Sequence, residues 1–150
     1  MDVDGTLTDG KIYMGAKGEA IKAFNIKDGF GIHDIIPSSG ITPVIITGRK
    51  SSIVEQRCEE LCINDLFQGV KDKISVLKNY LEENRAQLSE VAYIGDDLND
   101  LPCMILVKSA GGIIGCPADA AEEVKKTSDF VSQFVGGNGA VREFIEVICK

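Results

Sequence analysis

Three short apolar runs constrain the fold of this chain more strongly than any other feature of its sequence. They cover residues 42–48, 65–70 and 91–97, and they end in small, polar or acidic residues. Their β-branched residues, without polar alternation, are typical of strands that are covered on both faces. The segments between the runs show helical patterns. Strands that alternate with helices in this way predict an α/β fold with a Rossmann-like, mostly parallel sheet flanked by helices.

The helices and the remaining strands follow from the same kind of pattern. Ser52 and Glu55 form a predicted capping box that opens the helix after the first apolar run. In the next helix Ile74, Leu77 and Leu81 recur at helical spacing. The further predicted elements are a helix that begins near 28–36, helices over 51–61, 71–84, 119–128 and 139–150, and strands over 110–116 and 129–132.

Residues 11–26 do not follow this alternation. Two runs with strand character flank the turn-prone segment 15–19, which predicts a β-hairpin inserted ahead of the first helix. Only Met1 precedes Asp2, where the apolar residues of a central strand are expected, so we expect residues to be missing upstream. The length allows one core, and 1–150 is interpreted as a single domain.

The composition limits the class of protein and its partners. The formal net charge is −7, and no basic stripe with interleaved aromatic residues suggests binding to nucleic acid. No apolar run approaches the length of a membrane span, and no leader pattern is present. We therefore expect a cytoplasmic location and no association with a membrane. The five cysteines and the single histidine form no zinc-binding spacing, and the cysteines are interpreted as buried, reduced thiols.

Reactive polar residues gather near the predicted ends of several strands. In open α/β sheets, ligands bind at the edge formed by the carboxyl ends of the strands. We therefore expect side chains that are far apart in the sequence to meet at this edge. These residues are Asp2, Asp4, Thr47, Lys73, Asp96 and Asp97.

Together these residue types predict phosphoryl transfer through an aspartyl phosphate. A carboxylate nucleophile needs a magnesium ion to offset its repulsion from an anionic phosphate, and Asp2 and Asp96 can supply oxygen ligands. The hydroxyl of Thr47 and the ammonium of Lys73 can bind the phosphate oxygens in the transition state. Asp4 follows the nucleophile by two residues and so lies on the same side of an extended chain. It can protonate the leaving oxygen and later deprotonate the attacking water.

Four segments, DVDGTLTDG, ITGR, GVKDK and GDDLND, resemble the motifs of the haloacid dehalogenase superfamily of phosphatases, in the same order. The resemblance covers nearly the whole chain and implies the fold of that superfamily. The roles that it implies are nucleophile for Asp2, general acid/base for Asp4, phosphate or substrate binding for Thr47, Gly48 and Lys73, magnesium binding for Asp2, Asp96 and the Asp4 carbonyl, and supporting roles for Asp97, Asn99 and Asp100.

A narrower resemblance is carried by DGTLTDGKIYM, KAFNIKDGFGI and GGNGAVREFIE. These segments are similar to those of the 3-deoxy-D-manno-octulosonate 8-phosphate phosphatase family. The resemblance implies a homotetramer in which the inserted hairpins meet around the centre. The gaps between the motifs are too short for a separate cap domain. We therefore expect a neighbouring subunit to cover the site, with the 11–26 hairpin and the 135–143 loop as candidate contributors.

The substrate that this resemblance implies is a keto-deoxy sugar acid phosphate, which carries a carboxylate as well as a phosphate. Arg49 is the leading candidate to bind the carboxylate, because the planar guanidinium suits that group. In the family, arginine at this position resembles the eight-carbon version, whereas the nine-carbon branch can carry glutamate. The eight-carbon phosphate is therefore the favoured substrate and the nine-carbon phosphate the alternative. Arg57 and Arg142 are weaker candidates.

Other interpretations stay open at this point. A homologous module of acylneuraminate cytidylyltransferases serves in oligomerisation, but here every catalytic position is occupied. A signalling receiver domain uses similar residues, yet its acidic pair comes first in the chain and its acceptor aspartate in the middle. Asp97 and Asp100 can also be caps of the following helix. Asp28 is interpreted first as a turn residue, and otherwise as a substrate contact across a subunit boundary.

Overall fold

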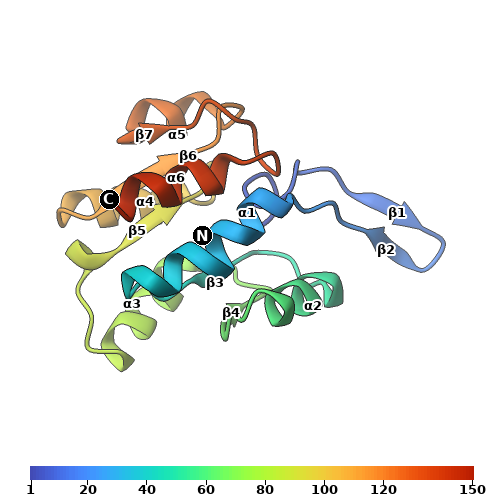
Figure 1. The fold of residues 1–150 in the computed structure, drawn as a ribbon, viewed down its shortest axis with the longest axis horizontal. Coiled ribbons are helices and arrows are strands. Elements are labelled where there is room, and N and C mark those ends of the chain that lie inside the picture. Colours follow the sequence, from blue (N-terminus) through green and yellow to red (C-terminus); the bar gives the residue numbers. More distant parts are fainter.

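The computed structural model describes residues 1–150 (Figure 1). A π-helical turn and a 3₁₀ turn, over residues 31–39, continue α1. The strands and α-helices, in chain order, are β1 (Tyr13–Gly15), β2 (Gly18–Ile21), α1 (Ile26–Phe30), β3 (Val44–Ile46), α2 (Ser52–Glu60), β4 (Asp65–Phe67), α3 (Lys73–Glu83), β5 (Ala92–Ile94), α4 (Leu101–Ser109), β6 (Ile113–Cys116), α5 (Glu122–Thr127), β7 (Phe130–Val131) and α6 (Ala140–Ile148).

The core strands are parallel, and helices connect them. β3 pairs with β4, while β5, β6 and β7 form a three-stranded sheet. A helix connects each of these neighbouring pairs, namely α2, α4 and α5, because parallel strands need a long crossover connection. The predicted α/β fold with parallel strands and flanking helices is confirmed. The strands are shorter than the apolar runs that predicted them.

The first two residues lie between the two parallel sheets. The carbonyl oxygen of Met1 accepts a hydrogen bond from the N–H of Ile46 in β3 (3.0 Å). The N–H of Asp2 donates to the carbonyl oxygen of Ile94 in β5 (3.2 Å). A mostly apolar cavity of about 440 Å³ is lined by residues of both strands and by Met1. The central strand expected ahead of Asp2 stays a prediction, and Asp2 itself lies where β3 and β5 end.

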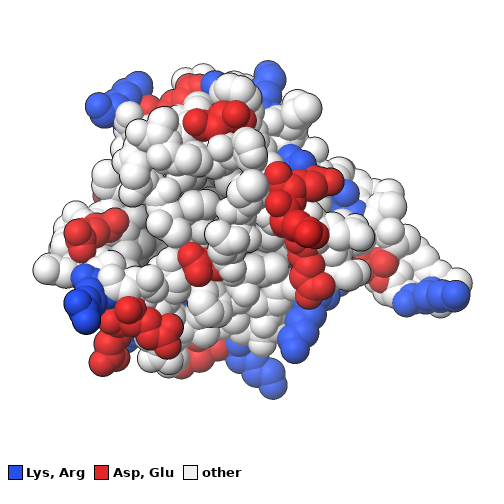
Figure 2. All heavy atoms as spheres, turned by 60° about the horizontal axis from the view of Figure 1, so that its bottom comes forward, with Lys and Arg blue, Asp and Glu red and all other residues white.

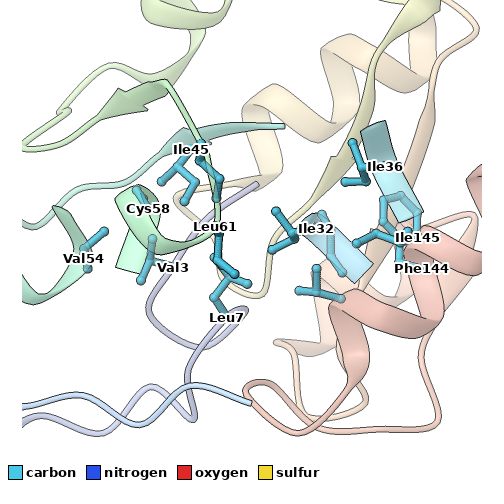
Figure 3. Packing of buried hydrophobic residues seen from close by; sticks show 13 residues of the cluster. Val3, Leu7, Ile32, Ile36, Ile45, Val54, Cys58, Leu61, Phe144 and Ile145 are labelled. Atoms are coloured by element: carbon cyan, nitrogen blue, oxygen red, sulfur yellow. The ribbon is translucent and has the colours of Figure 1, made fainter. Parts of the chain in front are cut away.

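The hydrophobic core anchors the loop that follows Asp2. Figure 3 shows the cluster that joins this loop to the segment after α1, to α2 and to α6. Val3 and Leu7 of the loop are buried in it. On the other side of the cluster, Ile32 packs near Phe144 and Ile145 of α6 (Figure 3). Val3 precedes Asp4 and Leu7 follows it, so their burial fixes the first acidic motif, residues 2–10, to the core.

The predicted hairpin is present, and it projects from the body of the molecule (Figure 1). β1 and β2 are antiparallel and shorter than the predicted 11–26 insertion. Met14 and Ile21 are 68% and 59% exposed. The side chain of Asn25 then caps α1 by accepting a hydrogen bond from the N–H of Lys27 (2.8 Å). The fold of one chain thus leaves apolar hairpin side chains uncovered.

The predicted capping box at the start of α2 is wrong. Ser52 is the first helical residue, and Ser51 takes the N-cap position without a side-chain hydrogen bond. Gln68, which follows β4, replaces the box: it accepts from the N–H of Ser51 (2.9 Å) and donates to Glu55 (3.0 Å). The contacts of Gln68 with the start of α2 thus take the place of the predicted capping box within the helix.

The cysteines are free thiols, and three of them are buried as expected: Cys58, Cys103 and Cys116. Burial raises the pKa of Cys58 and of Cys103 to about 11. Cys62 is exposed and Cys149 is half-buried, so the expectation is wrong for Cys62. Cys62 lies after the last turn of α2, between the buried residues Leu61 and Ile63.

The surface charges are dispersed on the face shown in Figure 2. Lys and Arg side chains lie mostly around its edge, and no continuous basic stripe crosses it. None of the helices combines the length and the apolar character that a membrane span requires.

Candidate active site

A compact loop carries the first two aspartates of the site. The carbonyl oxygen of Val3 accepts backbone hydrogen bonds from the amides of residues 6–8. Gly5 has a φ of +94°, and a Cβ there would lie 2.0 Å from a carboxylate oxygen of Asp96. Only glycine allows this backbone conformation together with so close an approach. The loop that holds Asp2 and Asp4 therefore packs directly on the acidic motif after β5.

Lys73 lies between two buried carboxylates. Its Nζ atom is 2.9 Å from Asp2 Oδ1 and 2.8 Å from Asp100 Oδ1. The hydroxyl of Tyr93 donates to the same oxygen of Asp100 (2.8 Å). Burial alone would lower the pKa of Lys73, but the attraction of Asp100 and Asp2 outweighs it and raises this pKa. Lys73 is thus a charged ammonium in the first turn of α3, directed at Asp2.

Three carboxylates form a group that fits a divalent cation. One oxygen each from Asp2, Asp96 and Asp100 lies within 4.8 Å of the others. Burial, and then the nearby charge of Asp100, raises the pKa of Asp2, while burial raises that of Asp96 to about 7. Asp2 Oδ1 is buried and accepts no hydrogen bond of good geometry. Three crowded carboxylates, one of them with an unsatisfied oxygen, suit Mg²⁺, which prefers hard oxygen ligands.

The side chain of Asp4 contacts two cations. Lys22 forms an ion pair with Asp4 Oδ1, and Arg49 Nε lies 3.8 Å from Asp4 Oδ2. Both cations also contact Glu19, at 2.9 Å from Lys22 and 3.4 Å from Arg49. Asp4 therefore lies at the boundary between the buried carboxylates and a charged cluster supplied in part by the hairpin.

Thr47 and Gly48 lie at the same edge of the sheet. Thr47 follows β3 directly and is buried, and its N–H donates to the carbonyl oxygen of Phe67 (2.9 Å). Ile46, the residue before Thr47, donates a backbone hydrogen bond to Met1, the residue before Asp2. Thr47 and Asp2 therefore follow this hydrogen-bonded pair on two neighbouring segments. Gly48 follows and is exposed.

The acidic motif after β5 divides into buried and exposed residues. Asp97 and Asn99 are exposed, and Asp97 accepts a hydrogen bond from the N–H of Leu98 (2.8 Å). Asp100 is fully buried and makes no side-chain cap to α4. Its other oxygen accepts from the N–H of Asp96 (3.3 Å). The capping alternative for Asp100 is therefore wrong, because its carboxylate is taken up by Lys73 and by the backbone before the helix.

The two weaker arginine candidates are occupied elsewhere. Arg57 pairs with Glu60 (3.0 Å) on α2, and Arg142 pairs with Glu146 (2.6 Å) on α6. Within one chain, neither arginine contacts the aspartates of the first motif.

Sequence reasoning missed four side chains that contact the site residues. Thr6 donates to Asp96 (2.8 Å), and its place inside the first motif was a usable signal. Lys22 interrupts the otherwise apolar segment AIKAF, and this interruption was a weaker signal. The other two, Glu19 and Tyr93, offered no signal, because their importance comes from contacts with distant residues.

Comparison with curated proteins finds close relatives over almost the whole chain, although no family model matches it. The 3-deoxy-D-manno-octulosonate 8-phosphate phosphatase KdsC of Escherichia coli K12 is 44% identical over 148 residues, which cover 99% of this chain and 76% of the relative. The enzymes of the same name from Salmonella typhi and Yersinia pestis are also 44% identical, over 148 and 147 residues.

Solved structures that resemble this chain include phosphatases of the same name. The phosphatase of the same name from Yersinia pestis superimposes with a TM-score of 0.90 at 42% identity, and the match covers 98% of this chain and 77% of that one. The Moraxella catarrhalis enzyme, solved with magnesium, phosphate and KDO, has a TM-score of 0.90 at 41% identity, with 99% and 82% covered. A cobalt-bound form from Haemophilus influenzae has a TM-score of 0.90 at 37% identity, with 98% and 83% covered.

Proposed function

The chain belongs to the 3-deoxy-D-manno-octulosonate 8-phosphate phosphatase family of the haloacid dehalogenase superfamily, and we propose that it hydrolyses this sugar acid phosphate with Mg²⁺, through an aspartyl phosphate on Asp2. One observation carries the assignment of the residues. Lys73 Nζ lies 2.9 Å from Asp2 Oδ1, at the edge where Asp96 and Asp100 complete a group of three carboxylates. A nucleophile, a phosphate-binding cation and a metal-binding group therefore share one place.

In the first step an oxygen of Asp2 attacks the phosphorus atom. The bond between phosphorus and Asp2 forms, the bond to the sugar oxygen breaks, and Asp4 gives its proton to that oxygen. Lys73 and Thr47 bind the phosphate oxygens as negative charge spreads over them. In the second step water attacks the same phosphorus atom, Asp4 takes a proton from the water, and the bond to Asp2 breaks to release phosphate.

Asp2 and Asp96, two of the three clustered carboxylates, would hold Mg²⁺ together with the carbonyl oxygen of Asp4. When bound, it supplies positive charge that offsets the repulsion between carboxylates and phosphate. Asp100, although it lies in the same carboxylate group, holds Lys73, and Asp97 and Asn99 support the motif from its exposed side.

A phosphate-release assay over a panel of sugar phosphates tests this function. We expect the eight-carbon sugar acid phosphate to be the best substrate and excess chelator to abolish turnover, because the carboxylates then repel the substrate. Asp2→Asn removes the nucleophile and is expected to leave no turnover. Asp4→Asn is expected to slow turnover by about two to four orders of magnitude.

The matched control for these variants is Asp34→Asn, which alters an exposed carboxylate outside the site. It should keep wild-type activity. Full activity of Asp2→Asn, or of the wild type in excess chelator, contradicts the proposed mechanism.

We propose that Arg49 selects the eight-carbon substrate by binding its carboxylate. Its side chain is 44% exposed beside Asp4, so it can turn towards a bound ligand. Arg49→Ala is expected to raise KM for the eight-carbon phosphate by about tenfold, as the loss of a charge-assisted hydrogen bond predicts. The preference over the nine-carbon phosphate should fall with it. If the preference for the eight-carbon phosphate is unchanged in Arg49→Ala, Arg49 does not determine the substrate specificity.

We further propose that the chain forms a homotetramer in which a neighbouring subunit covers the site. The exposed apolar side chains of the hairpin, Met14 and Ile21, support this arrangement, as does Ile26 at 84% exposure. The 135–143 loop is the second candidate contributor. The expected cytoplasmic location stays a prediction.

A further inference from the structure

Lys22 brings a buried charge from the hairpin segment to the site. It lies directly after β2, and its ammonium contacts Asp4 Oδ1 and lies 2.9 Å from Glu19 Oε1. Its side chain is only 1% exposed. A buried ammonium is unfavourable unless it is paired, so the two carboxylates and the ammonium hold one another in place.

Arg49, the other cation of this cluster, is placed differently. It is 44% exposed, and its contacts with Asp4 and Glu19 are longer, at 3.8 and 3.4 Å. Arg49 can leave these contacts and meet a substrate. Lys22 cannot reach solvent without breaking both of its ion pairs, so its contacts are directed to Asp4 and Glu19 and not to a ligand.

We propose that Lys22 is a positioning residue that, anchored by Glu19, holds the Asp4 carboxyl group in the orientation from which it transfers protons. This inference rests on the proposed phosphatase function. Apart from Lys22, the charged partner of Asp4 is Arg49, whose side chain is 44% exposed and whose Nε atom lies 3.8 Å from Asp4 Oδ2. Without Lys22 the Asp4 side chain gains rotamers, and fewer of them point at the leaving oxygen. The inserted hairpin then serves catalysis within its own subunit.

Three phosphate esters distinguish this role from its alternatives. The eight-carbon sugar acid phosphate needs a proton on its leaving oxygen and carries a carboxylate. Glycerol 3-phosphate needs the proton but has no carboxylate. The third ester, p-nitrophenyl phosphate, releases a stable anion and needs no proton. The value of kcat/KM reports the steps up to the release of the leaving group, and therefore the proton donated by Asp4.

Lys22→Met is the decisive variant, because it keeps the length of the side chain and removes its charge. We expect kcat/KM to fall by about 10- to 100-fold for both alkyl phosphates, and by no more than about threefold for p-nitrophenyl phosphate. Lys22→Arg should recover part of the loss, since it restores a cation. When Lys22→Met is added to Asp4→Asn, kcat/KM should fall little below that of Asp4→Asn alone, because both changes impair the same proton transfer.

Other outcomes overturn the proposal. An equal loss for all three esters means a structural role, and a loss confined to the carboxylated ester means that Lys22 binds the substrate. Lys126→Met, an exposed lysine on α5 outside the site and the hairpin, is the matched control and should leave all three values unchanged.

A crystal structure of Lys22→Met gives a readout independent of activity. We expect the Asp4 carboxyl group to be rotated or spread over several conformers. An Asp4 side chain that keeps its wild-type orientation overturns the proposal. Wild-type protein that releases phosphate from none of the three esters refutes the proposed function instead, and this structure still tests the position of Asp4.

Discussion

Asp28 shows how far a single side chain can act from its own element. It belongs to α1 and is 1% exposed, so its interpretation as a turn residue is wrong. Its carboxylate accepts hydrogen bonds from the N–H groups of Gly139 (3.1 Å) and Arg142 (2.8 Å) at the start of α6. α6 has no cap of its own, and Asp28 supplies one from a distant part of the chain.

The pKa of Asp28 predicts a pH-dependent stability. Burial raises this pKa above its usual 3.8, although backbone hydrogen bonds from the start of α6 favour the carboxylate. A carboxyl group whose pKa is higher in the folded state stabilises the fold below its unfolded pKa and loses that contribution as pH rises through its folded pKa. The wild type should therefore lose free energy of unfolding relative to Asp28→Asn as pH rises above about 4.

Urea unfolding of the two proteins across this pH range measures the difference. Glu82→Gln, an exposed position on α3, is the control and should run parallel to the wild type. A gap between wild type and Asp28→Asn that stays constant with pH, or changes in the opposite direction, contradicts the prediction.

At the scale of elements, the loop before α6 fits closely over the first acidic motif. The N–H of Gly137 donates to the carbonyl oxygen of Thr6 (3.0 Å). A Cβ at Gly136 would lie 1.8 Å from the carbonyl oxygen of Gly5. The N–H of Gly136 also donates to Asp119 (2.9 Å), so the loop cannot move freely to make space. Two elements from opposite ends of the chain thus share one backbone interface.

Gly136→Ala is expected to lower both stability and activity. The clash is with backbone, so either loop must shift, at a cost of about 1–3 kcal/mol, and a shift carries Asp2 and Asp4 with it. Thermal unfolding and the phosphate-release assay measure the two effects. Gly40→Ala is the control: Gly40 has a φ of +70° but open space around its Cβ. It should cost about 1 kcal/mol and leave kcat/KM unchanged.

At the scale of the whole molecule, one chain leaves apolar surface on its projecting hairpin. Met14 and Ile21 lie there, and Phe30 of α1 is 51% exposed as well. Such surface is expected to be covered by another chain, because water is a poor solvent for it.

Met14→Glu combined with Ile21→Glu tests the proposed homotetramer. Charges on the hairpin oppose burial of this surface, so sedimentation should show a tetramer for the wild type and smaller species for the variant. Ile105→Glu, a 48% exposed position on α4, is the control and should stay a tetramer. A wild type that sediments as a monomer contradicts the proposal, as does a variant that keeps its assembly.

Much of the architecture could be predicted because it depends on local patterns. The apolar runs at β3, β4 and β5 predicted parallel strands, and the turn-prone residues of segment 15–19 predicted the hairpin. The capping box at Ser52 failed because Gln68, from another element, offered a better partner for Glu55. The expected burial of Cys62 failed because exposure depends on what packs against a residue and not on its neighbours in sequence.

By itself the sequence determined which residue types end the strands, and so which aspartates, threonine and lysine are available at one edge. Only the tertiary structure decided how they pair: Lys73 between Asp2 and Asp100, Asp4 with Lys22, and Asp96 with Thr6. The physical reason is range. Strand and helix patterns reflect spacings of a few residues, whereas a buried ion pair depends on which distant segments the core brings together and on how much water they exclude.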